Sequence, residues 1–165
     1  MSSAQQLIQY TADSFKAIIT FAEEDNAVSD IITDCLKKGS KIFFCGNCGS
    51  AGGAQHLETE FLGRFLKERQ ALRAIALTTN PSAAGAIAND YGYVEVFSRQ
   101  SLGLAKAGDV LVGISTSGDN SNVTEVFHTA KEHQVKTIAL TGQKASDANA
   151  VADIAIRGLS TKTPR

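Results

Sequence analysis

Two different hydrophobic periods divide this chain. Up to about residue 38, apolar residues recur every three or four positions, as they do on one face of an amphipathic helix. This spacing predicts two helices, over residues 4–22 and 25–38, and Gly39 marks the end of the second. Beyond that point, short continuous apolar runs alternate with helical patterns, which is typical of buried strands joined by crossover helices.

Five apolar runs have the length of buried strands, and small or hydroxylated residues follow each of the first four. The predicted strands are 41–44, 74–77, 110–114, 137–140 and 154–156. The predicted helices of this part are 52–66, 82–88, 94–105, 121–133 and 145–151. The alternation predicts an α/β fold, a three-layer sandwich with helices on both faces of a five-stranded parallel sheet. Ligands of such sheets bind beyond the carboxyl ends of the strands.

Composition limits the class of protein. The 165 residues, 43% hydrophobic and 20% charged, fit one domain with a helical segment over about 1–38 and a sheet-containing core over about 39–165. A net charge of −1 gives no electrostatic reason to expect nucleic acid or an anionic membrane as a partner. No apolar run has the length of a membrane span, and the N-terminus has no signal-peptide pattern. Three cysteines do not suggest a disulfide framework, so we expect a cytoplasmic protein.

Cys45 and Cys48 form a Cys-x-x-Cys motif. Such a motif can be a redox pair or half of a zinc site. No second cysteine pair is present, and Cys45 ends a predicted strand, whereas redox motifs of the thioredoxin type begin a helix. We therefore favour a buried Cys45 and an incidental Cys48.

The strongest chemical signal is the segment that follows the first predicted strand. Its loop, Gly46–Gly53, contains only small residues, which lets a ligand approach the backbone closely. The helix that follows offers unpaired N–H groups to an anion, and it carries His56 and Glu60 one turn apart on the same side. This unit could hold a phosphate next to a metal or an acid/base pair. The alternative is a solvated pair on a helix face, to which Glu58 and Arg64 would also belong.

A second loop, Ser115–Asn122, follows the third predicted strand. Its hydroxyl and backbone N–H groups could form a neutral cradle for a phosphate, although they could also simply cap the next helix. No Walker lysine follows, and neither loop matches the dinucleotide pattern Gly-x-Gly-x-x-Gly. The presence of two such loops, each at a strand end, favours phosphate binding.

Asn89, Asp90 and two histidines are further candidates for polar contacts. The stretch Asn89–Gly92 has the composition of a turn, but the side chains of Asn89 and Asp90 could also bond sugar hydroxyls. His128 and His133 lie on an ordinary amphipathic helix, and we expect both at the surface.

Together these motifs closely resemble the phosphoheptose isomerases, which are sugar isomerase (SIS) domain enzymes. The similar segments are Cys45–Arg64, Leu77–Thr79, Ala88–Gly92, Phe97–Gln100 and Gly108–Gly118. The resemblance implies a flavodoxin-like SIS fold and a homotetramer. It also implies conversion of sedoheptulose 7-phosphate to D-glycero-D-manno-heptose 7-phosphate through an enediol, for lipopolysaccharide synthesis.

The same resemblance assigns roles to individual residues. Those expected to bind the phosphate are Ser50, Ser115, Thr116, Ser117 and Asn120, the last standing where the family has serine. Those expected to line the sugar site are Asn47, Cys48, Gly49, Asn89 and Asp90. His56 and Glu60 are expected to be zinc ligands, and Glu60 is also expected to be the catalytic base.

The chain departs from the family pattern at several places. Cys48 stands where the family usually has glycine, and Asn80 where many relatives have aspartate. Relatives continue into a terminal helix that supplies a glutamine and a histidine as zinc ligands, so we expect an incomplete zinc site here. The rival hypothesis is a non-catalytic SIS module that binds sugar phosphate or a replication initiator. That branch lacks the glutamate of His-x-x-x-Glu, so Glu60 favours an enzyme.

Overall fold

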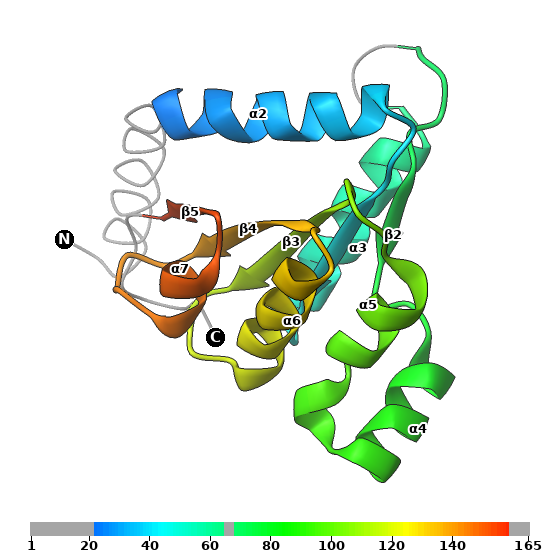
Figure 1. Ribbon diagram of the computed structural model, residues 1–165, viewed down its shortest axis with the longest axis vertical. Coiled ribbons are helices and arrows are strands. Elements are labelled where there is room, and N and C mark those ends of the chain that lie inside the picture. The colour runs from blue at the N-terminus through cyan, green and yellow to red at the C-terminus, as the bar shows by residue number, and fades with distance from the viewer. Residues whose placement is uncertain (1–21, 65–67, 159–165) are drawn as a thin grey trace, which may run out of the picture.

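A five-stranded parallel sheet forms the centre of the computed structural model, which describes residues 22–64 and 68–158 (Figure 1). The strands are β1 (Ile42–Gly46), β2 (Ala74–Ala76), β3 (Val110–Ser115), β4 (Lys136–Thr141) and β5 (Ile154–Arg157). Their order across the sheet is β2-β1-β3-β4-β5, and all neighbours are parallel. Each strand overlaps the apolar run that predicts it, so the α/β class and the strand count are confirmed.

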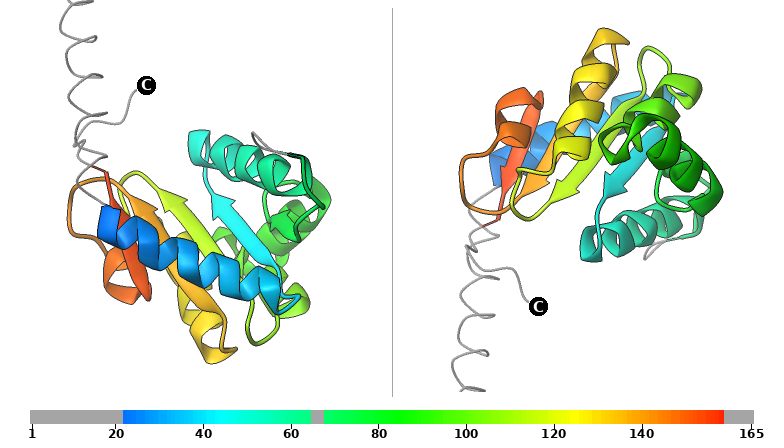
Figure 2. Two further views of the ribbon diagram at one scale, coloured as in Figure 1. Left: turned by 90° about the horizontal axis from the view of Figure 1, so that it is seen from above. Right: turned by 90° about the horizontal axis from the view of Figure 1, so that it is seen from below.

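Helices cover both faces of the sheet (Figure 2). On one face lie α2 (Ala22–Lys37) and α3 (Gly49–Leu62). On the other lie α4 (Pro81–Tyr91), the 3₁₀ turn η2 (Tyr93–Glu95), α5 (Ser98–Leu104), α6 (Ser121–Glu132) and α7 (Asp147–Val151). The predicted helix over residues 4–22 lies almost entirely outside the described residues. No helix within the described ranges is long and apolar enough to cross a membrane.

Successive residues of β1 explain why its apolar run is continuous rather than alternating. Phe43 packs into a core with Phe127 of α6, whereas Phe44 packs into a second core with Cys35 of α2. All four of these side chains are at most 4% exposed. A strand buried on both faces therefore needs apolar residues at every position.

The helix predicted over residues 82–88 is longer in the structure. Helix α4 begins at its cap residue Asn80, whose side chain accepts a hydrogen bond from the backbone of Ala83, and it continues through Tyr91. Asn89 and Asp90 are therefore helical rather than part of a turn, and the chain turns at Gly92, whose φ is +92°.

The helix predicted over residues 94–105 is divided into η2 and α5. Val96 and Phe97, which lie between them, are both almost fully buried in the same core. Both residues keep right-handed helical backbone angles, and the N–H of Val96 donates to the carbonyl oxygen of Tyr93, three residues back. The division therefore marks a local 3₁₀ turn before α5.

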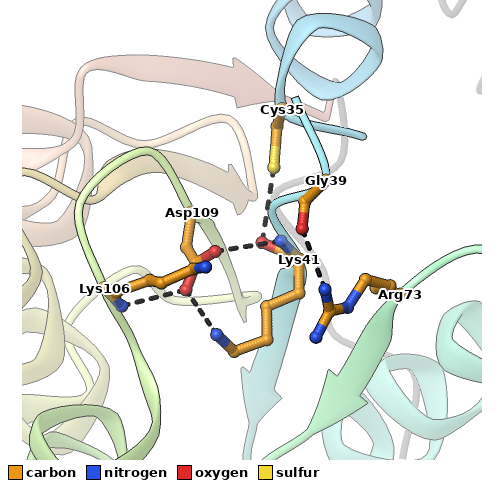
Figure 3. A network of polar contacts seen from close by, with 6 residues as sticks. All are labelled: Cys35, Gly39, Lys41, Arg73, Lys106 and Asp109. Atoms are coloured by element: carbon orange, nitrogen blue, oxygen red, sulfur yellow. Dashed lines mark hydrogen bonds and ion pairs between the residues drawn. The ribbon is translucent and has the colours of Figure 1, made fainter. Parts of the chain in front are cut away.

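Polar contacts join the amino ends of β1 and β3, at the edge of the sheet where both strands begin (Figure 3). The buried carboxylate of Asp109 accepts hydrogen bonds from the backbone nitrogen and the Nζ atom of Lys41, at 2.9 and 2.8 Å, and from the backbone of Lys106. The Sγ atom of Cys35 in turn donates to the carbonyl oxygen of Lys41. These contacts stabilise the edge of the sheet opposite to the loops Gly46–Gly53 and Ser115–Asn122.

Candidate functional site

The two loops expected to bind phosphate lie side by side at the carboxyl edge of the sheet. Strands β1 and β3 are neighbours, and Gly46 at the end of β1 pairs with Ile114 near the end of β3. The helices that follow them, α3 and α6, cover opposite faces, so the chain leaves the sheet in opposite directions at this point. Such a switch point forms a crevice in which doubly wound proteins bind ligands.

Gly46 allows the two loops to approach. A Cβ atom at this position would lie 2.8 Å from the carbonyl oxygen of Ile114 and 2.8 Å from the Cβ atom of Ser50. Both contacts are shorter than real carbon atoms tolerate. Because Gly46 has no side chain, Ser50, in the first turn of α3, can lie against the end of β3.

A tight turn joins β1 to α3. The backbone N–H of Ser50 donates to the carbonyl oxygen of Asn47 at 2.9 Å, and Cys48 has φ 51° and ψ −118°. These angles are those of the first central residue of a type II′ turn, a position that favours glycine. Cys48 thus adopts a glycine-like backbone and exposes its thiol beside the site.

Cys45 is buried, as the sequence predicts. Cys45 and Cys48 are both free, and Cys45 is fully buried while Cys48 is exposed. Burial raises the pKa of the Cys45 thiol to about 12, so this thiol stays protonated and is a poor nucleophile or metal ligand.

The second loop is held by its own hydrogen bonds. The buried Oγ atom of Ser115 donates to Oδ1 of Asn120 at 2.5 Å and accepts from the backbone N–H of Gly118 at 3.0 Å. The side chains of Thr116 and Ser117 are exposed, and the Oγ atom of Ser117 accepts a hydrogen bond from the backbone N–H of Asp119 at 3.2 Å. Ser115 and Asn120 shape the loop, while Thr116 and Ser117 are the hydroxyl groups available to a ligand.

Gly118 completes this loop with a left-handed backbone, φ +76°. A Cβ atom here would lie only 1.9 Å from the Oγ atom of Ser146, so a side chain has neither the backbone freedom nor the space. The loop therefore packs tightly against the start of α7.

One side-chain pair links the two loops directly. Nδ2 of Asn47 donates to Oδ1 of Asn122 at 2.9 Å, and Nδ2 of Asn122 donates back to Oδ1 of Asn47 at 3.0 Å. The hydroxyl group of Tyr93 adds a third hydrogen bond to Oδ1 of Asn47, at 3.2 Å. Sequence reasoning included Asn122 in the second loop but gave its side chain no role, and it did not single out Tyr93. The one sequence signal for Asn122 was its position next to Val123, on the apolar side of the predicted helix, where a polar side chain needs a partner.

His56 and Glu60 face each other on α3, as their spacing predicts. Nε2 of His56 lies 3.7 Å from Oε1 of Glu60, and 72% and 29% of the two side chains are exposed. They border a pocket of about 360 Å³ whose other lining residues are Leu57, Phe61 and Arg69. The pocket extends along the helix that starts at the first loop.

Arg69 was also missed from the sequence. Its guanidinium group donates to the carbonyl oxygens of Glu60 and Phe61, at the end of α3. A cation bonded to the last carbonyl groups of a helix stabilises that end. Arg69 thereby helps to hold the helix that carries Glu60.

The remaining candidates are less closely connected. Asn89 and Asp90 are exposed on the last turn of α4, where Nδ2 of Asn89 donates to Oδ1 of Asp90 at 2.8 Å. His128 and His133 are exposed, as expected. No group of three or more His, Cys, Asp or Glu side chains within residues 22–64 and 68–158 could hold a metal ion.

The fold and the site together define a class: doubly wound α/β domains that bind a ligand with two donor-rich loops at the switch point of the sheet. A family model described as the SIS domain matches residues 8–142, more than half of the sequence. The chain belongs to the SIS-domain family.

Similar proteins indicate which kind of SIS-domain protein the chain resembles. A phosphoheptose isomerase of Akkermansia muciniphila is 46% identical over 145 residues, covering 88% of this chain and 77% of the relative. One of Rhodospirillum rubrum is 44% identical over 157 residues, covering 95% and 84%. The solved structure of phosphoheptose isomerase GmhA from Neisseria gonorrhoeae has a TM-score of 0.86 and 38% identity, covering 97% of this chain and 88% of that one. These matches confirm the expected resemblance, the SIS fold and an isomerase of this type.

Proposed function

We propose that this chain converts sedoheptulose 7-phosphate into D-glycero-D-manno-heptose 7-phosphate, a step in lipopolysaccharide synthesis. The relatives named phosphoheptose isomerase support this reaction. The observation that carries it in this chain is the position of Glu60. Its half-buried carboxylate borders a pocket on the same helix that begins at the small-residue loop.

The reaction needs a base that can reach carbon. Glu60 removes a proton from C1, the electron pair forms the C1=C2 double bond, and the C2 carbonyl oxygen takes up a proton to give an enediol. The C1 hydroxyl then loses its proton to become the aldehyde, while C2 receives a proton from Glu60. A carboxylate on a rigid helix suits both transfers because it can stay within reach of the two adjacent carbons.

Two loops would hold the phosphate. The exposed hydroxyl groups of Thr116 and Ser117 and the first N–H groups of α6 would donate to it, with Ser50 on the opposite side. Ser115 and Asn120 support this arrangement through their internal hydrogen bond. Neutral donors and a helix N-terminus suit a phosphate that must be released again after each turnover.

A zinc ion is part of the proposal. His56 and Glu60 would supply two ligands, and zinc would stabilise negative charge on the sugar oxygens. Protein zinc sites use three or four ligands, so the described residues alone do not complete one. Glu60 alone accounts for the proton transfers at C1 and C2, while the proton gained by the C2 oxygen and the proton lost by the C1 hydroxyl group balance each other. Calorimetric titration of zinc into wild type and into His56→Ala tests the ligand role directly, because loss of a ligand should weaken zinc binding.

Cytoplasmic location and a homotetramer are proposed as well. The free thiols of Cys35, Cys45 and Cys48 suit a reducing compartment. The tetramer rests on the resemblance, and light scattering of the purified chain tests it.

Incubation with sedoheptulose 7-phosphate in D₂O tests the function. We expect a new aldose signal by NMR, together with deuterium at the carbon positions that exchange through the enediol. Calorimetry on the same sample separates the rival hypothesis. Binding without exchange or product would favour a non-catalytic sugar-phosphate module, and absence of both binding and turnover would refute the proposed function.

A further inference from the structure

The side-chain amide of Asn47 is held from two directions. It forms the reciprocal pair with Asn122, at 2.9 and 3.0 Å, and it accepts from the hydroxyl group of Tyr93 at 3.2 Å. The three residues come from three separate parts of the chain: the loop after β1, the first turn of α6, and η2. Because Asn47 is an expected substrate contact, the hydrogen bonds that its side chain can still form decide how it could bind the sugar phosphate.

An asparagine side chain has two N–H donors and an oxygen that accepts two hydrogen bonds. Both acceptor positions of Asn47 are used, one by Asn122 and one by Tyr93. One N–H is used by the Oδ1 atom of Asn122. Asn47 is only half-buried, and no hydrogen bond within the described residues uses its second N–H. In this state Asn47 can donate to a ligand but cannot accept from one.

Asn122 is the fixed partner. It is 2% exposed, and it lies between the cap residue Asn120 and the fully buried Val123 in the first turn of α6. Tyr93, by contrast, is 60% exposed. Turning over one amide alone would place like groups of the two amides against each other, so the pair fixes their relative orientation. The hydroxyl group of Tyr93, which donates to Oδ1 of Asn47, favours the arrangement in which that oxygen faces Tyr93.

We propose that Asn122, assisted by Tyr93, is a positioning residue that holds Asn47 as a pure hydrogen-bond donor toward an acceptor oxygen of the sugar phosphate. This proposal rests on the proposed function. A group fixed as donor favours a carbonyl, enediolate or phosphate oxygen over a hydroxyl group that needs to donate. The same pair also sets the distance between the two loops.

A double-mutant cycle tests the positioning role. We expect Asn122→Ala to weaken binding of sedoheptulose 7-phosphate about tenfold, the scale of one hydrogen bond lost. Asn47→Ala should weaken it at least as much, and the double variant no further than Asn47→Ala alone, because Asn122 acts through Asn47. Tyr93→Phe should cost about twofold to threefold. Additive effects in the double variant would overturn the proposal.

A charge variant gives a second readout when it is made both in wild type and in Asn47→Ala, because repulsion between a new carboxylate and the phosphate does not depend on Asn47. Asn122→Asp keeps the size and the acceptor but presents a carboxylate oxygen to Oδ1 of Asn47. Protonation of the new carboxyl restores a donor, so affinity relative to wild type should recover as the pH falls. If the affinity of Asn122→Asp relative to wild type does not change with pH, or changes equally in the Asn47→Ala background, the proposal is contradicted.

Thr137→Val is the matched control. Thr137 is fully buried and its hydroxyl group bonds Asp153, but it lies at the start of β4, at the opposite edge of the sheet. We expect lower thermal stability with unchanged affinity. If this variant loses affinity as Asn122→Ala does, stability alone explains both effects and the proposal fails. If wild type neither binds nor turns over the sugar phosphate, the proposed function fails instead, and the positioning role falls with it.

Discussion

The carboxylate of Asp109 and the side chain of Lys41 form an ion pair of 2.8 Å, and the same carboxylate also accepts the backbone N–H of Lys41. Asp109 is fully buried and only 14% of the Lys41 side chain is exposed. Asp109→Ala would leave a nearly buried ammonium group and two backbone N–H groups without their partner. We expect the free energy of unfolding, measured in urea, to fall by about 3–5 kcal/mol.

An exposed ion pair provides the control. Arg64 and Glu68 lie 3.6 Å apart, with 69% and 83% of their side chains exposed. Glu68→Ala should change the free energy of unfolding by less than about 1 kcal/mol. Similar losses in both variants would mean that burial of the Asp109 pair does not govern its contribution.

Glu60→Gln keeps the shape of the side chain and removes the base. Turnover of sedoheptulose 7-phosphate should fall on the order of 10²–10⁴-fold, with a smaller change in affinity. Glu58→Gln, on the same helix, should leave turnover near wild type. Near-normal turnover in Glu60→Gln would assign the proton transfer to another group.

Ser117→Ala removes an exposed hydroxyl group from the second loop. We expect sugar-phosphate binding to weaken by about 1.5–3 kcal/mol, the usual contribution of a hydrogen bond to a charged group. Calorimetry with sedoheptulose, which lacks the phosphate, is the control and should show no difference from wild type. An equal loss with both sugars would place Ser117 at the sugar rather than the phosphate.

Cys48→Gly should stabilise the chain. Cys48 occupies a backbone conformation that suits glycine, and a non-glycine residue there costs of order 1–3 kcal/mol. The greater freedom of glycine in the unfolded chain offsets about 0.5–1 kcal/mol of that gain. We expect a net gain of about 1 kcal/mol by thermal denaturation. Cys48→Ala removes the thiol without relieving the backbone, and it should be close to neutral.

The buried thiol of Cys45 makes stability depend on alkaline pH. Burial raises its pKa from 9.0 to about 12, so between these values the unfolded chain releases a proton that the folded chain keeps. Stability should therefore fall as the pH rises through this range, by about 1.4 kcal/mol per pH unit from this group. Cys45→Ala should have a shallower pH dependence in urea denaturation. An unchanged slope would show that other groups account for the alkaline loss.

Much of the fold follows from local pattern. The strands could be predicted because residues such as Phe43 and Phe44 are buried on opposite faces, which produces continuous apolar runs. The same local logic placed His56 and Glu60 on one side of a helix. It failed at Asn89 and Asp90, where turn-favouring residues complete a helix that a later glycine ends.

Contacts between distant residues could not be predicted in this way. Asn47 and Asn122 are 75 positions apart, and no period or spacing connects them. Arg69 lies eight and nine positions beyond the two carbonyl groups of α3 that it bonds, and Tyr93 reaches Asn47 across the bend at Gly92. The contacts of Asn47 depend on the assembled sheet, which brings the strand ends together.

That separation has a consequence for folding. The crevice does not exist until β1 and β3 have paired, so a nascent chain that ends before α6 has only half of it. Contacts between distant positions form slowly because a long loop must first close. A sugar phosphate therefore binds only to chains in which β1 and β3 have already paired. Its presence should slow the unfolding of the folded chain and leave the rate of folding almost unchanged.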